Sequence, residues 1–176
     1  MNSFFLIVFG ACLVHQGSSV GYWVNIVTVT SIIDNVSVKT DNSNKTIIVV
    51  NKDRTGYTFK ASILQNVFTE KGPVEGVVCD TDPNPNQAFI IKILFDLVGA
   101  DGCPVAVGEY PLISELIYRT DTFTLLKKGF RDASLRIGIK SHGNENAQKD
   151  DIIIWGHINE LTDSELDALG KKKEEK

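Results

Sequence analysis

The stretch that decides the fold is residues 79–110, CDTDPNPNQAFIIKILFDLVGADGCPVAVGEY. Two cysteines, Cys79 and Cys103, stand on either side of its central apolar run. The polar and Pro-rich residues that separate each cysteine from the run are typical of turns. We therefore expect one buried element enclosed between two cysteine-bearing turns.

The apolar run has the signals of a helix. Asn84 followed by Pro85 is typical of a helix start, and Gly99 lies where a helix commonly ends. Lys92 and Asp96 are four residues apart and give one narrow polar stripe, so the helix should be buried on most sides. A strand is the alternative, because large apolar residues also alternate across this run.

The first 19 residues differ in composition from the rest. An apolar run from Phe4 to Val14 is followed by small and polar residues up to Ser19, which is typical of a signal peptide. The run is shorter than the roughly 20 apolar residues that span a membrane, and no second run of that length follows. We expect residues 1–19 to be removed, no transmembrane segment, and a secreted, extracellular protein.

Removal of the signal peptide would take Cys12 with it and leave Cys79 and Cys103 as an isolated pair. In an oxidising compartment the simplest interpretation of such a pair is a disulfide, and the alternative is two free buried thiols. A bridge of this loop length would stabilise the fold by about 3 kcal/mol in the chain-entropy model. It would also hold both ends of the expected helix against a sheet.

Alternating apolar and polar residues predict antiparallel strands with one buried face on both sides of this stretch. The predicted strands lie near 22–27, 57–63, 133–139 and 152–158, and an apolar run at 47–50, a turn at 51–55 and the strand at 57–63 read as a hairpin. A capping box at Thr162–Glu165 predicts a short final helix ending at Gly170.

These elements predict a mainly β (α+β) fold. We expect an antiparallel β-cup or sandwich with one central helix and a short C-terminal helix. One domain should cover residues 20–170, followed by a charged tail at 171–176.

Charge and motifs argue against several functions. The net charge of -4, without a basic cluster, argues against a nucleic-acid partner. Only His142 and His157 follow the signal peptide, and no ligand spacing indicates a metal site. The chain has no nucleophile elbow, phosphate loop or dinucleotide fingerprint. We expect no enzyme, cofactor or metal; His157 is the best candidate base if the protein is an unrecognised hydrolase.

Large apolar side chains suggest a ligand pocket. The candidates are Tyr57, Phe59, Phe89, Ile93, Phe95, Phe123, Phe130 and Trp155. The alternative is that these residues fill an ordinary core, which composition does not distinguish from a hollow one. Asn35 and Asn44 begin glycosylation sequons, which belong on the surface of a secreted protein.

Three short motifs follow in order after the predicted helix: Cys103–Pro104, Gly108–Glu109–Tyr110 and Gly129–Phe130–Arg131. With the turn at 51–57 upstream, this order resembles an insect family of secreted proteins related to the ganglioside-activator and ML lipid-recognition proteins, including the chemosensory CheB proteins. The resemblance implies a β-cup with a hydrophobic cavity, a bridge that pins the helix region to the Cys-Pro strand, and no catalytic residue. Ganglioside activators carry several disulfides, whereas this chain can make one.

We therefore expect a secreted binding protein for a lipid or other apolar small molecule, acting as a chemosensory (contact pheromone) carrier or presenter, with a membrane receptor as a further partner. The alternative is a secreted interaction module, receptor-associated or salivary, with a filled core and no small ligand. An apolar void on the order of several hundred Å³ would favour the carrier, and a filled interior would favour the module.

Overall fold

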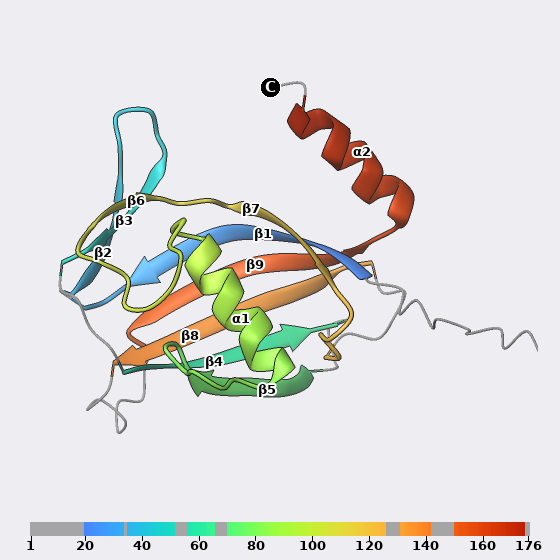
Figure 1. The fold of residues 1–176 in the computed structure, drawn as a ribbon. Helices are drawn as coiled ribbons and strands as arrows, with labels where there is room; N and C mark the ends of the chain where they lie inside the picture. The colour runs from blue at the N-terminus through green and yellow to red at the C-terminus, as the bar shows by residue number, and fades with distance from the viewer. Residues whose placement is uncertain are drawn as a thin grey trace, which may run out of the picture.

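The computed structural model describes residues 20–33, 35–51, 56–65, 70–125, 131–141 and 150–174, without the side chains of residues 70, 71 and 170–174. The predicted signal peptide, His142 and Phe130 lie outside these residues. The part of the chain described contains two antiparallel sheets and two helices, which confirms the mainly β, α+β prediction (Figure 1).

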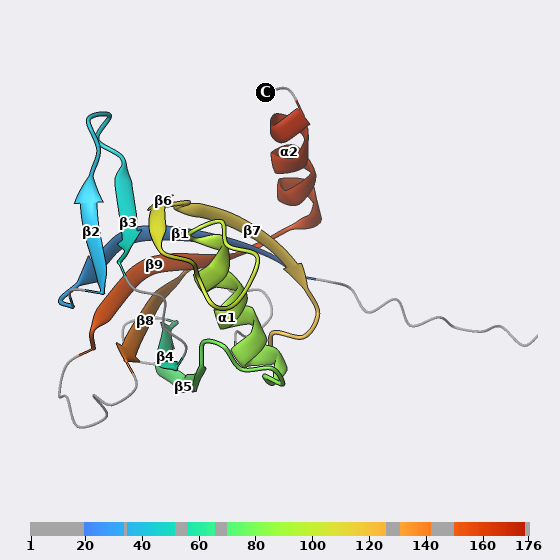
Figure 2. The same ribbon diagram turned by 60° about the vertical axis from the view of Figure 1, so that its left-hand side comes forward.

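The larger sheet has six strands in the order β5-β4-β8-β9-β1-β7. Its members are β1 (Val20–Ser31), β4 (Tyr57–Leu64), β5 (Glu70–Val77), β7 (Glu115–Thr120), β8 (Ala133–Ser141) and β9 (Ile152–Leu161). Every neighbouring pair is antiparallel. The sheet curves around α1 (Pro85–Asp96), which lies across its inner face (Figure 2).

The inner face follows from the alternation of residues along each strand. In β1, Tyr22, Val24 and Ile26 are buried, and a bulge between Ile26 and Thr28 then brings Val29 to the same side. In β8 and β9 the alternate isoleucines and leucines are buried in the same way. One apolar layer therefore forms between the sheet and α1, and it contains most of the hydrophobic core.

The helix over residues 85–96 confirms the helical interpretation of the apolar run. The Asn84 side chain accepts hydrogen bonds from the backbone N–H groups of Asn86 and Gln87, and the Gln87 side chain accepts one from the Asn84 N–H. Gly99 follows the helix with φ +61°, a conformation that glycine adopts without strain. The local caps thus fix both ends of α1.

The smaller sheet has the order β2-β3-β6, with β2 (Val36–Thr40), β3 (Thr46–Val50) and β6 (Gly108–Pro111). The predicted hairpin between residues 47–50 and 57–63 is therefore wrong, because β3 and β4 belong to different sheets. β3 pairs with β2 across a turn in which Asp41 accepts hydrogen bonds from two backbone N–H groups and Asn44 takes φ 63°.

The C-terminal helix α2 (Asp163–Glu174) begins at the predicted capping box. The Thr162 N–H donates to Glu165 Oε2 (2.8 Å), and this bond lowers the pKa of the Glu165 carboxyl. Leu166 is buried against Gly21, where a larger residue would collide with the leucine. The helix does not end at Gly170 as predicted but continues to Glu174, so residues 171–174 are helical rather than a separate tail.

An apolar pocket beside the disulfide

A pocket of about 130 Å³ lies where the C-terminal half of α1, the two sheets and the disulfide meet. The larger sheet contributes Val29, Tyr57, Ile139, Ile152 and Ile154, and the smaller sheet contributes Val36, Ile48 and Val50. The helix and the residues after it contribute Leu94, Phe95, Leu97 and Val98. The two cysteine-bearing turns add Val78, Cys79, Cys103 and Val105.

The cysteine pair forms part of the pocket wall. Cys79 and Cys103 are joined by a disulfide with a Cα–Cα distance of 5.6 Å, which confirms the predicted bridge. The bridge ties the turn after β5 to the segment that precedes β6, and α1 lies between these two points in the chain. One covalent bond thus holds together the side of the pocket that neither sheet supplies.

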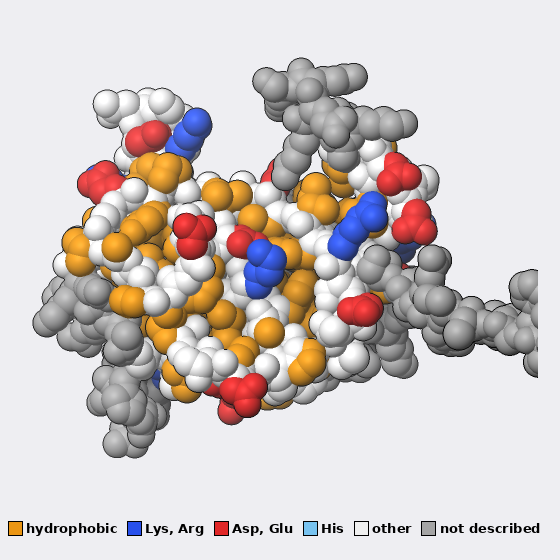
Figure 3. All heavy atoms as spheres, viewed as in Figure 1, with side chains coloured by type: hydrophobic (Ala, Val, Ile, Leu, Met, Phe, Trp, Pro, Cys, Tyr) orange, Lys and Arg blue, Asp and Glu red, His pale blue; other side chains and the backbone are white. Residues whose placement is uncertain are grey.

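Exposure changes from the floor of the pocket to its rim. Leu97 and Ile154 on the floor are buried, whereas Tyr57, Val78 and Val105 are half-buried and Cys103 is exposed. The pocket therefore reaches the surface beside the disulfide. In Figure 3 hydrophobic side chains gather around α1 on this face, with few charged side chains among them.

The lining is chemically simple. None of its sixteen side chains is acidic, basic or an amide, and Tyr57 alone carries a hydroxyl group. Among the residues that the structure describes, no group of three or more His, Cys, Asp or Glu side chains could hold a metal ion. Such a lining can remove apolar surface from water, and it has few groups that could orient a polar ligand.

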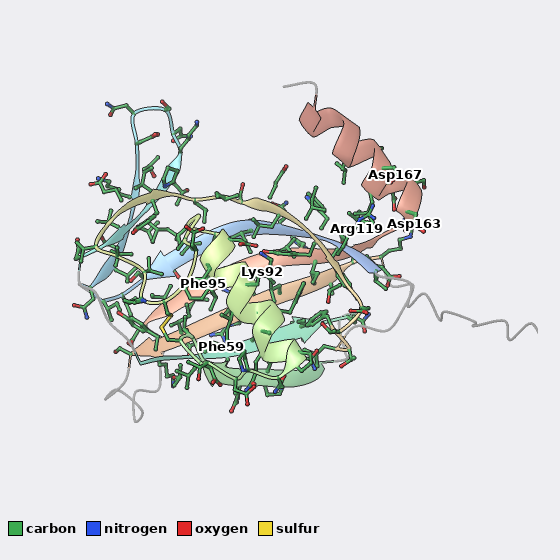
Figure 4. All side chains as sticks on the ribbon, in the orientation of Figure 1. Phe59, Lys92, Phe95, Arg119, Asp163 and Asp167 are labelled. Carbon is green, nitrogen blue, oxygen red and sulfur yellow. A yellow bond between two sulfur atoms is a disulfide. The ribbon has the colours of Figure 1, made fainter. Side chains whose placement is uncertain are left out.

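Two of the eight predicted pocket residues, Tyr57 and Phe95, do line the pocket. Phe95 lies on the side of α1 that faces the disulfide, as the labelled side chain in Figure 4 shows. Phe59, Phe89, Ile93 and Phe123 do not line it but are buried in the core. Trp155 is on the outer face of the sheet, 42% exposed, with the Arg136 guanidinium 5.5 Å from its ring centre.

The buried aromatic residues gather at the other end of the layer beneath α1. Phe89 contacts Phe123 and Tyr118 with ring centres 4.2 and 5.1 Å apart, and Tyr22 contacts Phe89 and Phe123 at 5.8 and 5.7 Å. We call these four residues the aromatic cluster. Burial raises the pKa of the Tyr118 hydroxyl, and the nearby Asp96 carboxylate raises it further.

Sequence reasoning missed most of the pocket because its wall is aliphatic. Ile48, Leu97 and Ile154 belong to runs of apolar residues that look the same whether they fill a core or surround a void. The one available signal was the cysteine pair, because Val77 and Val78 precede Cys79 and Pro104 and Val105 follow Cys103, so apolar residues adjoin the bridge.

The remaining predicted sites lie apart from the pocket. Asn44 is exposed at the β2–β3 turn, and Asn35 is half-buried before β2. His157 is on the outer face of β9, with Nδ1 3.5 Å from an oxygen of the exposed Asp132 carboxylate.

Within the described residues, neither helix is long and apolar enough to cross a membrane.

No family model, no curated protein and no solved structure matches the chain.

Proposed function

We propose that this protein is a secreted binding protein for an apolar small molecule, or for one end of a hydrocarbon chain, held in the pocket beside the disulfide. The observation that carries the proposal is a void enclosed by sixteen side chains, none of them charged at neutral pH. Side chains from α1 and both sheets converge on it, so the fold itself keeps it open.

The size of the pocket limits the ligand. An engineered apolar cavity of about 150 Å³ stays dry and binds benzene, so a pocket of about 130 Å³ suits a single ring or a short alkyl segment. Burial of about 200 Å² of ligand surface would contribute about 5 kcal/mol before the cost of ordering the ligand. A longer lipid would have to extend out past the rim.

Secretion and family membership are parts of the same proposal. A disulfide is typical of oxidising compartments, and it is compatible with the signal peptide predicted at residues 1–19. A helix lying on a curved antiparallel sheet, with an apolar void beneath it, is also what the resemblance to the ML and ganglioside-activator proteins implied. On the basis of that resemblance we propose that the protein carries a ligand and does not catalyse a reaction.

One observation favours the second candidate, an interaction module without a small ligand. The pocket is smaller than the several hundred Å³ typical of sites that enclose a drug-sized molecule. The two functions differ in whether the pocket is occupied, and this difference can be measured directly.

The test is displacement of a fluorescent apolar probe from the delipidated secreted protein by 1-octanol. An Ile154→Phe variant should lose at least about tenfold in octanol affinity, because the new ring occupies the floor of the pocket. Trp155→Ala, the adjacent substitution on the outer face, is the control and should bind normally. If octanol does not bind the native protein, or binds Ile154→Phe equally well, the carrier function is wrong.

A further inference from the structure

The pocket is apolar, but carboxylates lie around it. Asp80 directly follows the lining residue Cys79, and Asp101 is two residues before Cys103; both are exposed at the disulfide side of the rim. The Asp80 carboxylate accepts a hydrogen bond from the backbone N–H of Asp82, which adds a second acidic side chain to the turn that contains Cys79.

A further carboxylate is close to the opposite wall. Asp151 is 2% exposed and directly precedes the lining residue Ile152. Its Oδ2 accepts hydrogen bonds from the Ser141 backbone N–H (2.6 Å) and hydroxyl (2.7 Å). These two bonds fix the buried carboxylate beside Ser141, at the residue that precedes the pocket wall.

Described cations are absent from the lining itself. Those nearest in sequence to lining residues are Lys92 and Lys140. Lys92 pairs with Asp96 at 2.9 Å on the solvent side of α1. Lys140 follows the lining residue Ile139 along β8, so it points to the opposite face of the sheet.

We infer that the pocket selects uncharged apolar ligands and excludes those that end in a carboxylate, such as fatty-acid anions. This inference rests on the proposed function and names the class of ligand. A carboxylate drawn into the pocket would lose its water and find only the Tyr57 hydroxyl as a donor among the lining side chains, and one left at the rim would face Asp80 and Asp101. An alcohol, ester or hydrocarbon meets neither cost.

Three probes with the same eight-carbon chain test the inference at pH 7.5: 1-octanol, octanoate and octylammonium. Octanoate should bind at least about tenfold more weakly than octanol, because of desolvation and repulsion together. Octylammonium should bind more tightly than octanoate, because the carboxylates that repel an anion at the rim attract a cation. Equal binding of octanoate and octanol, or of the two charged probes, would overturn the inference.

Variants of the rim separate repulsion from the general cost of burying a charge. Asp80→Asn/Asp101→Asn should strengthen octanoate binding about threefold at low ionic strength, with the gain shrinking at high salt. Asparagine at position 80 can still accept the Asp82 N–H bond, so the turn is preserved. The control, Asp121→Asn/Asp167→Asn, removes two exposed charges near the other end of β1, where Thr120 pairs with Val20 and Asp167 contacts Arg119.

The outcomes distinguish this inference from the proposed function. If octanol binds but the rim variants leave octanoate affinity unchanged, or the control changes it equally, the repulsion from the rim is refuted and the pocket stands. If octanol itself does not bind, the failure belongs to the carrier function.

Discussion

The two ends of the layer between α1 and the larger sheet share α1 and β1 but differ in their packing: aromatic rings contact one another at one end, and a pocket lies at the other. At the N-terminal half of α1, Phe89 packs against Tyr22, Tyr118 and Phe123. At its C-terminal half, Leu94 and Leu97 line a pocket of about 130 Å³. Large rings therefore close one end, while shorter aliphatic side chains leave the other open.

The difference indicates how one sheet can serve both stability and binding. Rings in edge-to-face contact fill space densely and add to the stability beyond their buried area. A void lowers stability, because its lining lacks partner atoms on one side. We expect the aromatic cluster and the disulfide to offset that loss.

Phe89→Ala should have the largest effect, because the Phe89 ring contacts the other three rings of the aromatic cluster. We expect a loss of about 4 kcal/mol in the free energy of unfolding. Urea unfolding followed by circular dichroism measures it. Phe95→Ala, on the half-buried wall of the pocket, is the matched control and should cost less than half as much. Equal losses would mean that the two ends do not differ in packing.

The disulfide should matter next. Cys79→Ser/Cys103→Ser should lower the free energy of unfolding by about 3 kcal/mol, because the unfolded chain regains the freedom of the closed loop. The same change should weaken octanol binding, since the bridge forms part of the pocket wall. Unchanged stability together with unchanged affinity would show that the bridge supports neither the fold nor the pocket.

Two positions on β9 allow a direct comparison of the two ends. Ile154 lines the pocket, and Ile158, four residues later on the same face, is completely buried outside it. Ile158→Phe should cost about 2 kcal/mol through overpacking, whereas Ile154→Phe has space for its ring and should cost less than about 1 kcal/mol. Urea unfolding of both variants measures the difference. If Ile154→Phe lost more unfolding free energy than Ile158→Phe, the void would not lie at Ile154.

The sequence predicted those parts of the fold that depend on neighbours in the chain. The N-cap of α1 at Asn84, the turn at Gly99 after the helix and the capping box at Thr162 each depend on groups within a few residues in the chain. The strands followed from alternation, since each needs only one buried face. Both helix starts and most strands were therefore correct.

Pairing between distant strands was less predictable. The polar residues at 51–55 suggested a hairpin, but the stronger turn chemistry lies at Asp41–Asn44, where a side chain accepts two N–H bonds and asparagine takes a left-handed conformation. A turn of that kind fixes the β2–β3 pairing, and the other edge of β3 pairs with β6 rather than with β4.

The pocket could not be predicted for a different reason. The prediction placed the pocket mainly at aromatic residues, but Phe89 and Phe123 pack against each other in the core, which was the alternative. Whether Ile48 or Ile154 meets another side chain or an empty space depends on the distance between elements, which no local pattern encodes.

The smallest effect concerns pH and belongs to the aromatic cluster. Burial and the Asp96 carboxylate raise the pKa of Tyr118 above the ordinary value of 10.0. Below pH 10 both folded and unfolded chains keep this proton, so stability does not depend on it. As the pH rises above 10, the unfolded chain loses the proton while the folded chain keeps it. The free energy of unfolding should then fall by about 1.4 kcal/mol per pH unit for this group.

Urea unfolding between pH 8 and pH 11 measures this slope. Tyr118→Phe should have a shallower decline, because phenylalanine does not ionise in either state. Burial also raises the pKa of Tyr22, so Tyr22→Phe should reduce the slope as well. If the native protein and Tyr118→Phe decline in parallel, the Tyr118 hydroxyl ionises as readily in the folded chain as in the unfolded one. The aromatic end would then be open to water and no longer the filled counterpart of the pocket.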